Sequence, residues 1–282
     1  MSNKIIALVD ASVYGRSVCE HSAWIAGRLS LPVELVHVLT RPAAESADLS
    51  GSIALGARTA LLTELTRLDE ERAKLAQKQG RALLEDAKGI VAAGGVSVSE
   101  RLRHGEVVEA IADLEAEAAM IVVGKRGEAA DFNKLHLGSN LERLARASHK
   151  PLFVASRAFK PLKRFLIAFD GGTSSLKAVD HVTRSPLLAG LEARLLMAGS
   201  PSVDLRRKLD GAQAQLEGAG FTVTAEVRDG APETVIAEAI EREAVDLLVM
   251  GAYGHSRIRT LLIGSTTTQM LRACKVPVLL FR

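Results

Sequence analysis

The chain contains one sequence pattern twice, and this internal repeat constrains its fold more than any other feature. Residues 138–154 (GSNLERLARASHKPLFV) align without gaps to residues 264–280 (GSTTTQMLRACKVPVLL). Pro151 therefore matches Pro277, and each starts an apolar terminal run, a position where a strand tolerates the missing N–H of proline. Because repeats of this kind are copies of one structural unit, we expect the two halves to share one fold.

Within each half, apolar runs alternate with helical segments, which is typical of a parallel sheet covered by helices. We therefore predict an α/β protein of two tandem five-stranded parallel-sheet domains with helices on both faces, residues 1–157 and 162–282. The junction falls at Arg157 to Leu162, where the pattern is interrupted. The predicted strands are 4–9, 33–39, 96–103, 119–124 and 151–155 in the first half, and 163–169, 191–198, 221–228, 246–251 and 277–281 in the second.

The halves differ by one large block. Asp10 to Gly124 spans 114 positions, whereas Asp170 to Gly251 spans 81. The additional residues, Leu55 to Gly95, have leucines near helical spacing and predict one long amphipathic helix. We favour a solvated helix that packs on the sheet over a helix that binds a partner.

Composition excludes several classes of function. A net charge of +3, from 36 basic and 33 acidic residues, is too small to indicate nucleic-acid binding, and aromatic residues make up only 4%. The two cysteines, Cys19 and Cys274, form neither a disulfide framework nor a zinc-site spacing, and we interpret them as small core residues.

The start of the chain, MSNKIIALVD, lacks the basic segment and long apolar run of a signal peptide, and no apolar run reaches the length of a bilayer span. We therefore predict a cytoplasmic protein with no membrane partner.

The stretch 251–267, GAYGHSRIRTLLIGSTT, carries the strongest indication of function. Gly251 ends an apolar run that reads as a buried parallel strand, and glycine there lets backbone approach a ligand closely. Gly264 to Thr267 open a helical segment, whose free N–H groups and positive dipole end favour an anion. A nucleotide phosphate is the expected guest.

The first half repeats this stretch imperfectly, as Gly124, Gly127, Gly138 and Ser139. Ten residues separate Gly127 from Gly138, where the second half has nine, and Leu141 stands where the second half has the hydroxyl of Thr267. Lys125 and Arg126 follow the first glycine and could offset phosphate charge, but we expect such loop residues to face solvent. The second half should therefore hold the better site.

These residues resemble the universal stress protein family in its tandem form. The ATP-binding members carry glycine, two residues, glycine, nine residues, glycine and then Ser or Thr, which Gly251, Gly254, Gly264 and Ser265 match. The resemblance covers nearly the whole chain and implies that ATP, with or without Mg²⁺, lies across the strand ends. Asp170 would approach the adenosine and Ala198 the adenine. No Walker lysine motif is present.

Carried over residue by residue, the family pattern predicts a binding site in each half. In the second half the predicted residues are Asp170, Gly171, Gly172, Thr173, Ala198, Met250, Gly251, Gly254, His255, Gly264, Ser265, Thr266 and Thr267. In the first half they are Asp10, Val38, Gly124, Gly127, Gly138 and Ser139. Single-copy members pair through their terminal strands, so the resemblance also implies a homodimer or an intramolecular pairing of 151–155 with 277–281.

The preferred interpretation is an ATP-binding regulatory module for the stress response that is not an enzyme, with slow hydrolysis left open. We assign no catalytic or metal-binding residue; His255, the nearest candidate base, is better read as a phosphate contact or a loop residue. An adenylyl-transferring enzyme is the second hypothesis, although DGGTSS at Asp170 lacks the serine and aspartate of the SGGxDS loop. The third is a scaffold that binds no nucleotide.

Overall fold

The computed structural model describes residues 3–40, 55–127, 139–252 and 264–282 of the chain, with the side chains of 55–62 and 139 excepted. The first half contains β1 (Lys4–Leu8), α1 (Gly15–Leu29), β2 (Val33–Leu39), α2 (Leu55–Ala92), β3 (Val98–His104), α3 (Val107–Ala112), β4 (Ala118–Gly124), α4 (Ser139–Ala147) and β5 (Leu152–Ala155). The second contains β6 (Arg164–Ala168), α5 (Thr173–Arg184), β7 (Glu192–Ala198), α6 (Val203–Gly218), β8 (Val223–Arg228), α7 (Pro232–Arg242), β9 (Leu247–Gly251), α8 (Ser265–Ala273) and β10 (Val278–Phe281). Each predicted strand is present, and its ends lie within two residues of the prediction.

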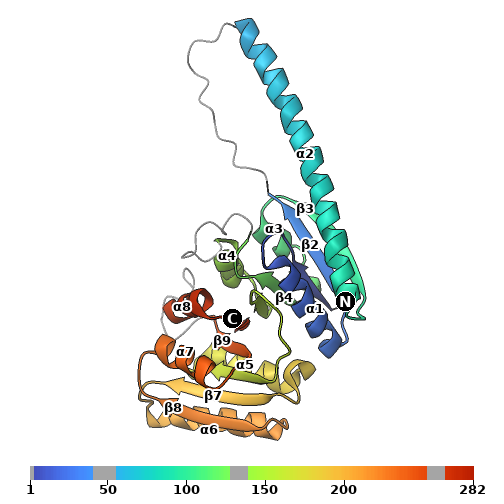
Figure 1. The fold of residues 1–282 in the computed structure, drawn as a ribbon. Coiled ribbons are helices and arrows are strands. Elements are labelled where there is room, and N and C mark those ends of the chain that lie inside the picture. Colours follow the sequence, from blue (N-terminus) through green and yellow to red (C-terminus); the bar gives the residue numbers. More distant parts are fainter. Residues whose placement is uncertain (1–2, 41–54, 128–138, 253–263) are drawn as a thin grey trace.

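The two halves form one continuous sheet in the order β3-β2-β1-β4-β5-β10-β9-β6-β7-β8. Pairing is parallel within each half, which confirms the predicted fold class. At the centre β5 and β10 pair antiparallel, with Phe153 opposite Leu279. The terminal strands therefore join the halves within one chain, which is the intramolecular pairing that the family resemblance implied (Figure 1).

Helices cover both faces of this sheet. On one face α1 contacts α2 and α5 contacts α6, and on the other α3 contacts α4 and α7 contacts α8. Side chains alternate between the two cores because successive residues of a strand point to opposite faces. Ile5 and Phe153 belong to one buried cluster, and Ile6 and Leu152 belong to the other. Each cluster runs through both halves, so burial as well as strand pairing holds the halves together.

Only the C-terminal part of α2 packs on the sheet, which corrects the prediction that the whole helix does so. Leu84, Ala87 and Val91 are buried, whereas Leu68 and Leu75 remain 38% and 56% exposed. The reason is length: a helix of 38 residues spans about 57 Å, and the seven-residue strand β3 beside it spans about 23 Å. The N-terminal part therefore projects beyond the body as an arm (Figure 1).

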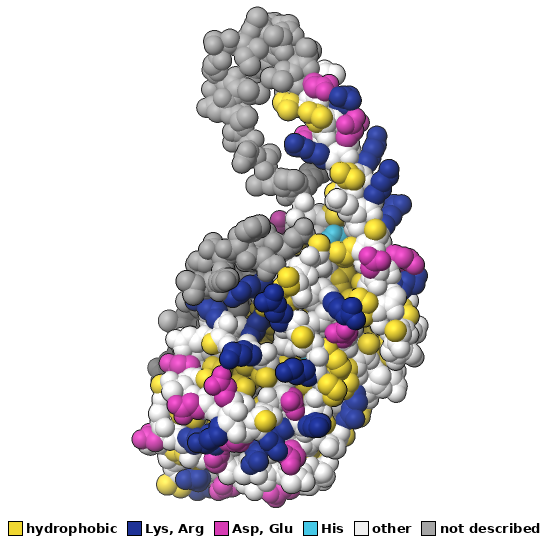
Figure 2. Space-filling view, in the orientation of Figure 1, with side chains coloured by type: hydrophobic (Ala, Val, Ile, Leu, Met, Phe, Trp, Pro, Cys, Tyr) yellow, Lys and Arg dark blue, Asp and Glu magenta, His cyan; other side chains and the backbone are white. Residues whose placement is uncertain are grey.

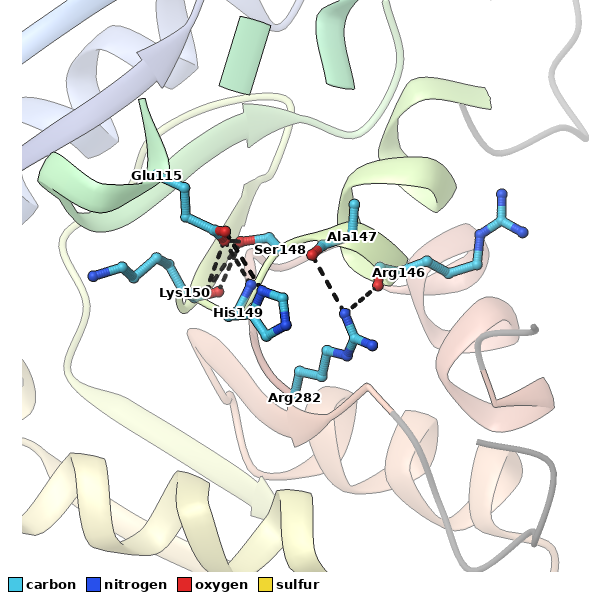
Figure 3. Close-up of polar contacts among 7 residues, drawn as sticks. All are labelled: Glu115, Arg146, Ala147, Ser148, His149, Lys150 and Arg282. Carbon is cyan, nitrogen blue, oxygen red and sulfur yellow. Dashed lines mark hydrogen bonds and ion pairs between the residues drawn. The ribbon is translucent and has the colours of Figure 1, made fainter. Parts of the chain in front are cut away.

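Arg282 holds one side of the seam between the halves. Its guanidinium donates hydrogen bonds to the carbonyl oxygens of Arg146 and Ala147, at the C-terminal end of α4 (Figure 3). The last carbonyls of a helix have no partner within the helix, and the dipole makes this end negative. A cation from the second half therefore caps a helix of the first.

Glu115 organises the turn between α4 and β5 (Figure 3). Its carboxylate accepts hydrogen bonds from the Ser148 hydroxyl at 2.6 Å and from the backbone N–H groups of His149 and Lys150 at 2.6 and 3.3 Å. Burial alone would raise the pKa of Glu115, but these hydrogen bonds outweigh it and hold the pKa below its ordinary value. The turn is thus fixed by an ionised carboxylate.

Lys125 holds the other side of the seam. It is 7% exposed, and its ammonium donates to the carbonyl oxygen of Cys274 at the end of α8. The prediction that Lys125 faces solvent was therefore wrong. Burial lowers the pKa of Lys125 and raises that of Cys274, and it raises the pKa of the Cys19 thiol to about 12. Both cysteines are buried and free, as small core residues should be.

Candidate nucleotide-binding site

A cavity of about 420 Å³ opens at the carboxyl ends of the second-half strands. In open α/β sheets this edge is where ligands bind, and the volume lies in the usual range of small-molecule sites. Eight of the predicted residues line it: Asp170, Ala198, Met250, Gly251, Gly264, Ser265, Thr266 and Thr267. The structure therefore brings together residues from three strand ends and from the start of α8.

The N-terminus of α8 forms one wall. Gly264 is its N-cap with extended backbone, no side chain caps the helix, and the first turn holds no acidic residue. The first recorded backbone bond at this end runs from the N–H of Thr268 to the carbonyl of Gly264. The N–H groups of Ser265, Thr266 and Thr267 precede that bond, so the positive end of the helix meets the cavity.

Apolar side chains also line the cavity. Its walls include Leu196, Ala198, Ile236 and Met250, contributed by β7, α7 and β9. A flat apolar ring would replace water favourably against such side chains. The cavity therefore combines a helix N-terminus suited to an anion with apolar walls suited to an aromatic base.

Asp170 lies where β6 gives way to α5. One of its carboxylate oxygens accepts from the backbone N–H of Gly172 at 2.9 Å and from the Ser175 hydroxyl at 2.7 Å. Gly171 next to it has a φ of +70°, a left-handed conformation that favours glycine. Gly171, Gly172 and Thr173 therefore form the turn and the start of α5 and are not among the residues that line the cavity. Asp170 is held in place by the N–H of Gly172 and the hydroxyl of Ser175.

Gly251 is required by packing against α5. A Cβ placed on Gly251 would lie 2.7 Å from the Cβ of Ser174, far inside van der Waals contact. Gly124 is in the same position in the first half, where a Cβ would lie 2.7 Å from the Cβ of Tyr14. Both glycines thus let a helix N-terminus approach the strand end, a reason different from the ligand approach expected from the sequence.

Thr267 uses its hydroxyl within the protein. It is 3% exposed and donates to the carbonyl oxygen of Gly251 at 3.1 Å. The N–H of Gly264 donates to the carbonyl of Ala252 at 3.2 Å, so the helix start is bonded back to the strand end twice. Thr267 therefore positions α8 through its side chain, and its backbone N–H is the group directed toward the cavity end of the helix.

The corresponding edge of the first half is built differently. Leu141 is 2% exposed and belongs to the core, so it offers the end of β4 no hydroxyl. Glu142 places a carboxylate in the first turn of α4, where the dipole already attracts negative charge. An anion at that helix end would meet this carboxylate, whereas α8 has none in its first turn.

Of the remaining first-half residues, Gly127 lies beside Asp10. A Cβ on Gly127 would lie 3.2 Å from a carboxylate oxygen of Asp10, so these two residues are adjacent. Asp10 also accepts from the backbone N–H of Ser12 at 3.1 Å, much as Asp170 accepts from Gly172. Val38 lies near the end of β2, half-buried. Ser139 begins α4, its side chain being outside the description.

Some predicted residues lie outside the described ranges: Gly138, Gly254 and His255. Other cavity residues were missed by sequence reasoning, including Pro201, Leu205 and Pro232. Local signals for them exist. Ser202 caps α6 by accepting from the N–H of Leu205 at 3.3 Å, and Pro232 occupies the first turn of α7. Both helices start at the same sheet edge as α8.

Among the described residues, no group of three or more His, Cys, Asp or Glu side chains could hold a metal ion. Within the same ranges, no helix has both the length and the apolar character to cross a membrane.

Comparison with known proteins gives a consistent result for both halves. The model of the universal stress protein family matches residues 1–156 and 161–282. Universal stress protein Slr1230 from Synechocystis sp. is 37% identical over 284 residues, which cover 99% of each chain. Universal stress protein MJ0577 from Methanocaldococcus jannaschii is 29% identical over 79 residues, 28% of this chain and 49% of the relative.

Among solved structures, a universal stress protein from Archaeoglobus fulgidus has a similar fold. Its TM-score is 0.74 with 19% identical residues, and the alignment covers 100% of this chain and 99% of that one. At this identity the likeness concerns the fold alone.

Proposed function

Since this chain belongs to the universal stress protein family, with two copies of the domain, we propose that it is a regulatory protein that binds one ATP in its second half. The observation that carries the proposal is the N-terminus of α8, which lines a cavity with neither a side-chain cap nor an acidic residue in its first turn. Backbone N–H groups at such a helix start are well suited to phosphate oxygens.

The rest of the cavity fits an adenosine. Leu196, Ile236 and Met250 offer apolar contact to the base, and Ala198 leaves room for its ring. The carboxylate of Asp170 can accept from a ribose hydroxyl or an amino group, and its internal hydrogen bonds keep it oriented. Mg²⁺ usually binds nucleotides through phosphate oxygens and waters, so it would need at most this one carboxylate.

The first half is proposed to bind ATP weakly or not at all. Leu141 replaces the hydroxyl that ties the helix start to the strand end, and Glu142 would repel a phosphate. The residue that packs against the strand-end glycine also differs: Tyr14, 8% exposed, contacts Gly124, whereas the much smaller Ser174 contacts Gly251. The expected stoichiometry is therefore one ATP per chain.

Calorimetric titration with ATP, with and without Mg²⁺, tests the proposal when two matched variants are compared. Thr266→Asp puts a carboxylate in the first turn of α8, which should stabilise the helix by about 0.3–1 kcal/mol while repelling phosphate. Asn140→Asp makes the same change in α4. We expect at least a 100-fold loss of ATP affinity for Thr266→Asp and no change for Asn140→Asp. Wild-type protein that binds no ATP, or equal losses in both variants, would refute the proposal.

The role proposed for ATP is that of a bound ligand that alters the protein surface for a partner. Two assays distinguish this from turnover. Release of inorganic phosphate at a rate well above that of ATP alone would indicate a hydrolase, and formation of AMP and pyrophosphate with an acceptor would indicate an adenylyl-transferring enzyme.

A further inference from the structure

The arm formed by the N-terminal part of α2 lacks a packing surface in the described structure. Every side chain from residue 63 to residue 75 is exposed, and Figure 2 shows hydrophobic atoms in view among the charged ones along it. A helix segment of this length is only marginally stable alone in water. Its stability should therefore increase on contact with a partner.

The arm carries its own apolar face. Leu65, Leu68 and Leu75 are 41%, 38% and 56% exposed, and they are three of the six exposed large hydrophobic side chains in the described residues. Spacings of three and seven place them on one side of the helix. This side lies roughly a third of a turn away from Leu84 and Val91, which pack on the sheet, at 100° per residue. The leucine face is thus separate from the core.

Charge divides the arm into two blocks of opposite sign. Residues 64–71 carry a net charge of −3, from four acidic residues and one basic one: Glu64, Asp69, Glu70, Glu71 and Arg67. Residues 72–81 carry a net charge of +4, from four basic residues and no acidic one: Arg72, Lys74, Lys78 and Arg81. Ion pairs join neighbours within the acidic block, as Arg67 does with Glu64 at 2.6 Å and Glu71 at 3.0 Å. They leave the polarity along the helix unchanged.

We propose that the arm is a self-association surface on which a second copy of this chain packs its own arm in the antiparallel direction. Antiparallel packing places the acidic block of each arm beside the basic block of the other, whereas parallel packing would place like charges together. Leu65, Leu68, Arg72 and Leu75 follow the alternating three-and-four spacing of a two-helix seam. Arg72 then lies next to the acidic block of the partner and can cover leucine with its apolar stem.

The shape of the molecule permits this arrangement. The body lies at the C-terminal end of the arm (Figure 1), so two antiparallel arms carry their bodies at opposite ends. Residues 63–79, which precede the buried Gly80, span about 25 Å, or roughly two and a half heptads. Because this seam is short, we expect association in the micromolar range.

Sedimentation velocity of the full chain from about 1 to 300 μM tests the apolar face. We expect a monomer–dimer equilibrium, whose dissociation constant rises at least tenfold when Leu65, Leu68 and Leu75 are replaced by Gln. The control, Ala73→Gln with Gln77→Ala on the opposite side of the helix, should leave it unchanged. Circular dichroism checks that all variants remain folded. A wild-type chain that stays monomeric throughout, or a leucine variant that dimerises as tightly as wild type, would overturn the proposal.

Charge reversal tests the direction. Changing Asp69, Glu70 and Glu71 to Lys raises the net charge of residues 64–81 from +1 to +7, and changing Lys74, Lys78 and Arg81 to Glu lowers it to −5. Each variant alone should lose the dimer at low salt, and an equimolar mixture should form a heterodimer. Added salt should weaken the wild-type dimer, because attraction between exposed charges is screened. Retention of both homodimers would exclude the antiparallel arrangement.

Discussion

The two halves share one fold but differ at the strand edge where a ligand would lie. In the second half, Ser174 and Thr267 are small and polar, and the start of α8 is hydrogen-bonded to the strand end at Gly251 and Ala252. In the first half, Tyr14 and Leu141 occupy the matching positions and are buried. The sheet and its strand-end glycines are therefore common to both halves, whereas the side chains at the helix starts that face them differ.

Leu141→Thr is the strongest test of that difference. The substitution gives the first half the hydroxyl of the second, but it removes a leucine that is 2% exposed. Loss of such a side chain costs about 2–4 kcal/mol of unfolding free energy. We expect this loss in urea denaturation and no second ATP in calorimetry, because Glu142 and Tyr14 remain. A second equivalent of bound ATP would show that this one hydroxyl is enough to create a binding site in the first half.

Gly251→Ala tests what the strand-end glycine is for. The new methyl group would overlap the Cβ of Ser174, and such overpacking costs about 1–3 kcal/mol. Adding Ser174→Gly should restore most of the stability, and the double variant should still bind ATP. If Gly251→Ala instead kept its stability and lost ATP binding, the glycine would be needed to let a ligand approach the backbone. Gly251 and Gly124 would then have different roles in the two halves.

Thr267→Val removes the hydrogen bond to the carbonyl of Gly251 without changing the size of the side chain. We expect a loss of about 1 kcal/mol in unfolding free energy, measured by urea denaturation. ATP affinity should fall by less than tenfold, because the backbone N–H groups of α8 are unchanged. A loss above 100-fold would mean that the hydroxyl contacts phosphate directly.

Glu115→Gln gives the smallest effect and probes the turn between α4 and β5 in the first half. The lowered pKa of Glu115 means that its contribution to stability is present above the ordinary value of 4.5 and is lost as pH falls through the lowered pKa. At pH 7 we expect a cost of about 0.5–1 kcal/mol, reduced from the buried-bond value by partial exposure. The unfolding free energies of wild type and Glu115→Gln should therefore converge as the pH is lowered from 7. A difference that stayed constant with pH would contradict the role assigned to the ionised Glu115.

The strands could be predicted because strands buried on both faces appear in the sequence as continuous apolar runs, such as Leu247 to Met250. The cavity residues contributed by strand ends and by α8 followed from the repeat and the family resemblance. The direction of individual side chains did not. Thr267 bonds to Gly251, and Lys125 bonds to Cys274 across the seam. The sequence did not predict these contacts, because the partners are separated along the chain and meet only when it folds.

The extent of α2 was predicted well, whereas its surroundings were not. Periodicity identifies which side of a helix is apolar, and Leu55 to Gly95 differs little from the observed Leu55–Ala92. It does not reveal whether a strand of matching length lies beneath. β3 has only seven residues, so the N-terminal part of α2 extends beyond it. The exposure of the leucines in this part could therefore be seen only in the structure.

The antiparallel contact between β5 and β10 has a consequence for how the two halves can differ. In a dimer of identical chains, each substitution occurs twice, and both sides of the two-fold axis must tolerate it. In this chain each substitution occurs once, so Lys125 can cross one side of the seam and Arg282 the other. Dilution cannot separate the halves. The two halves can therefore differ within one molecule: α2 of the first half carries the arm, and the strand ends of the second half line the cavity.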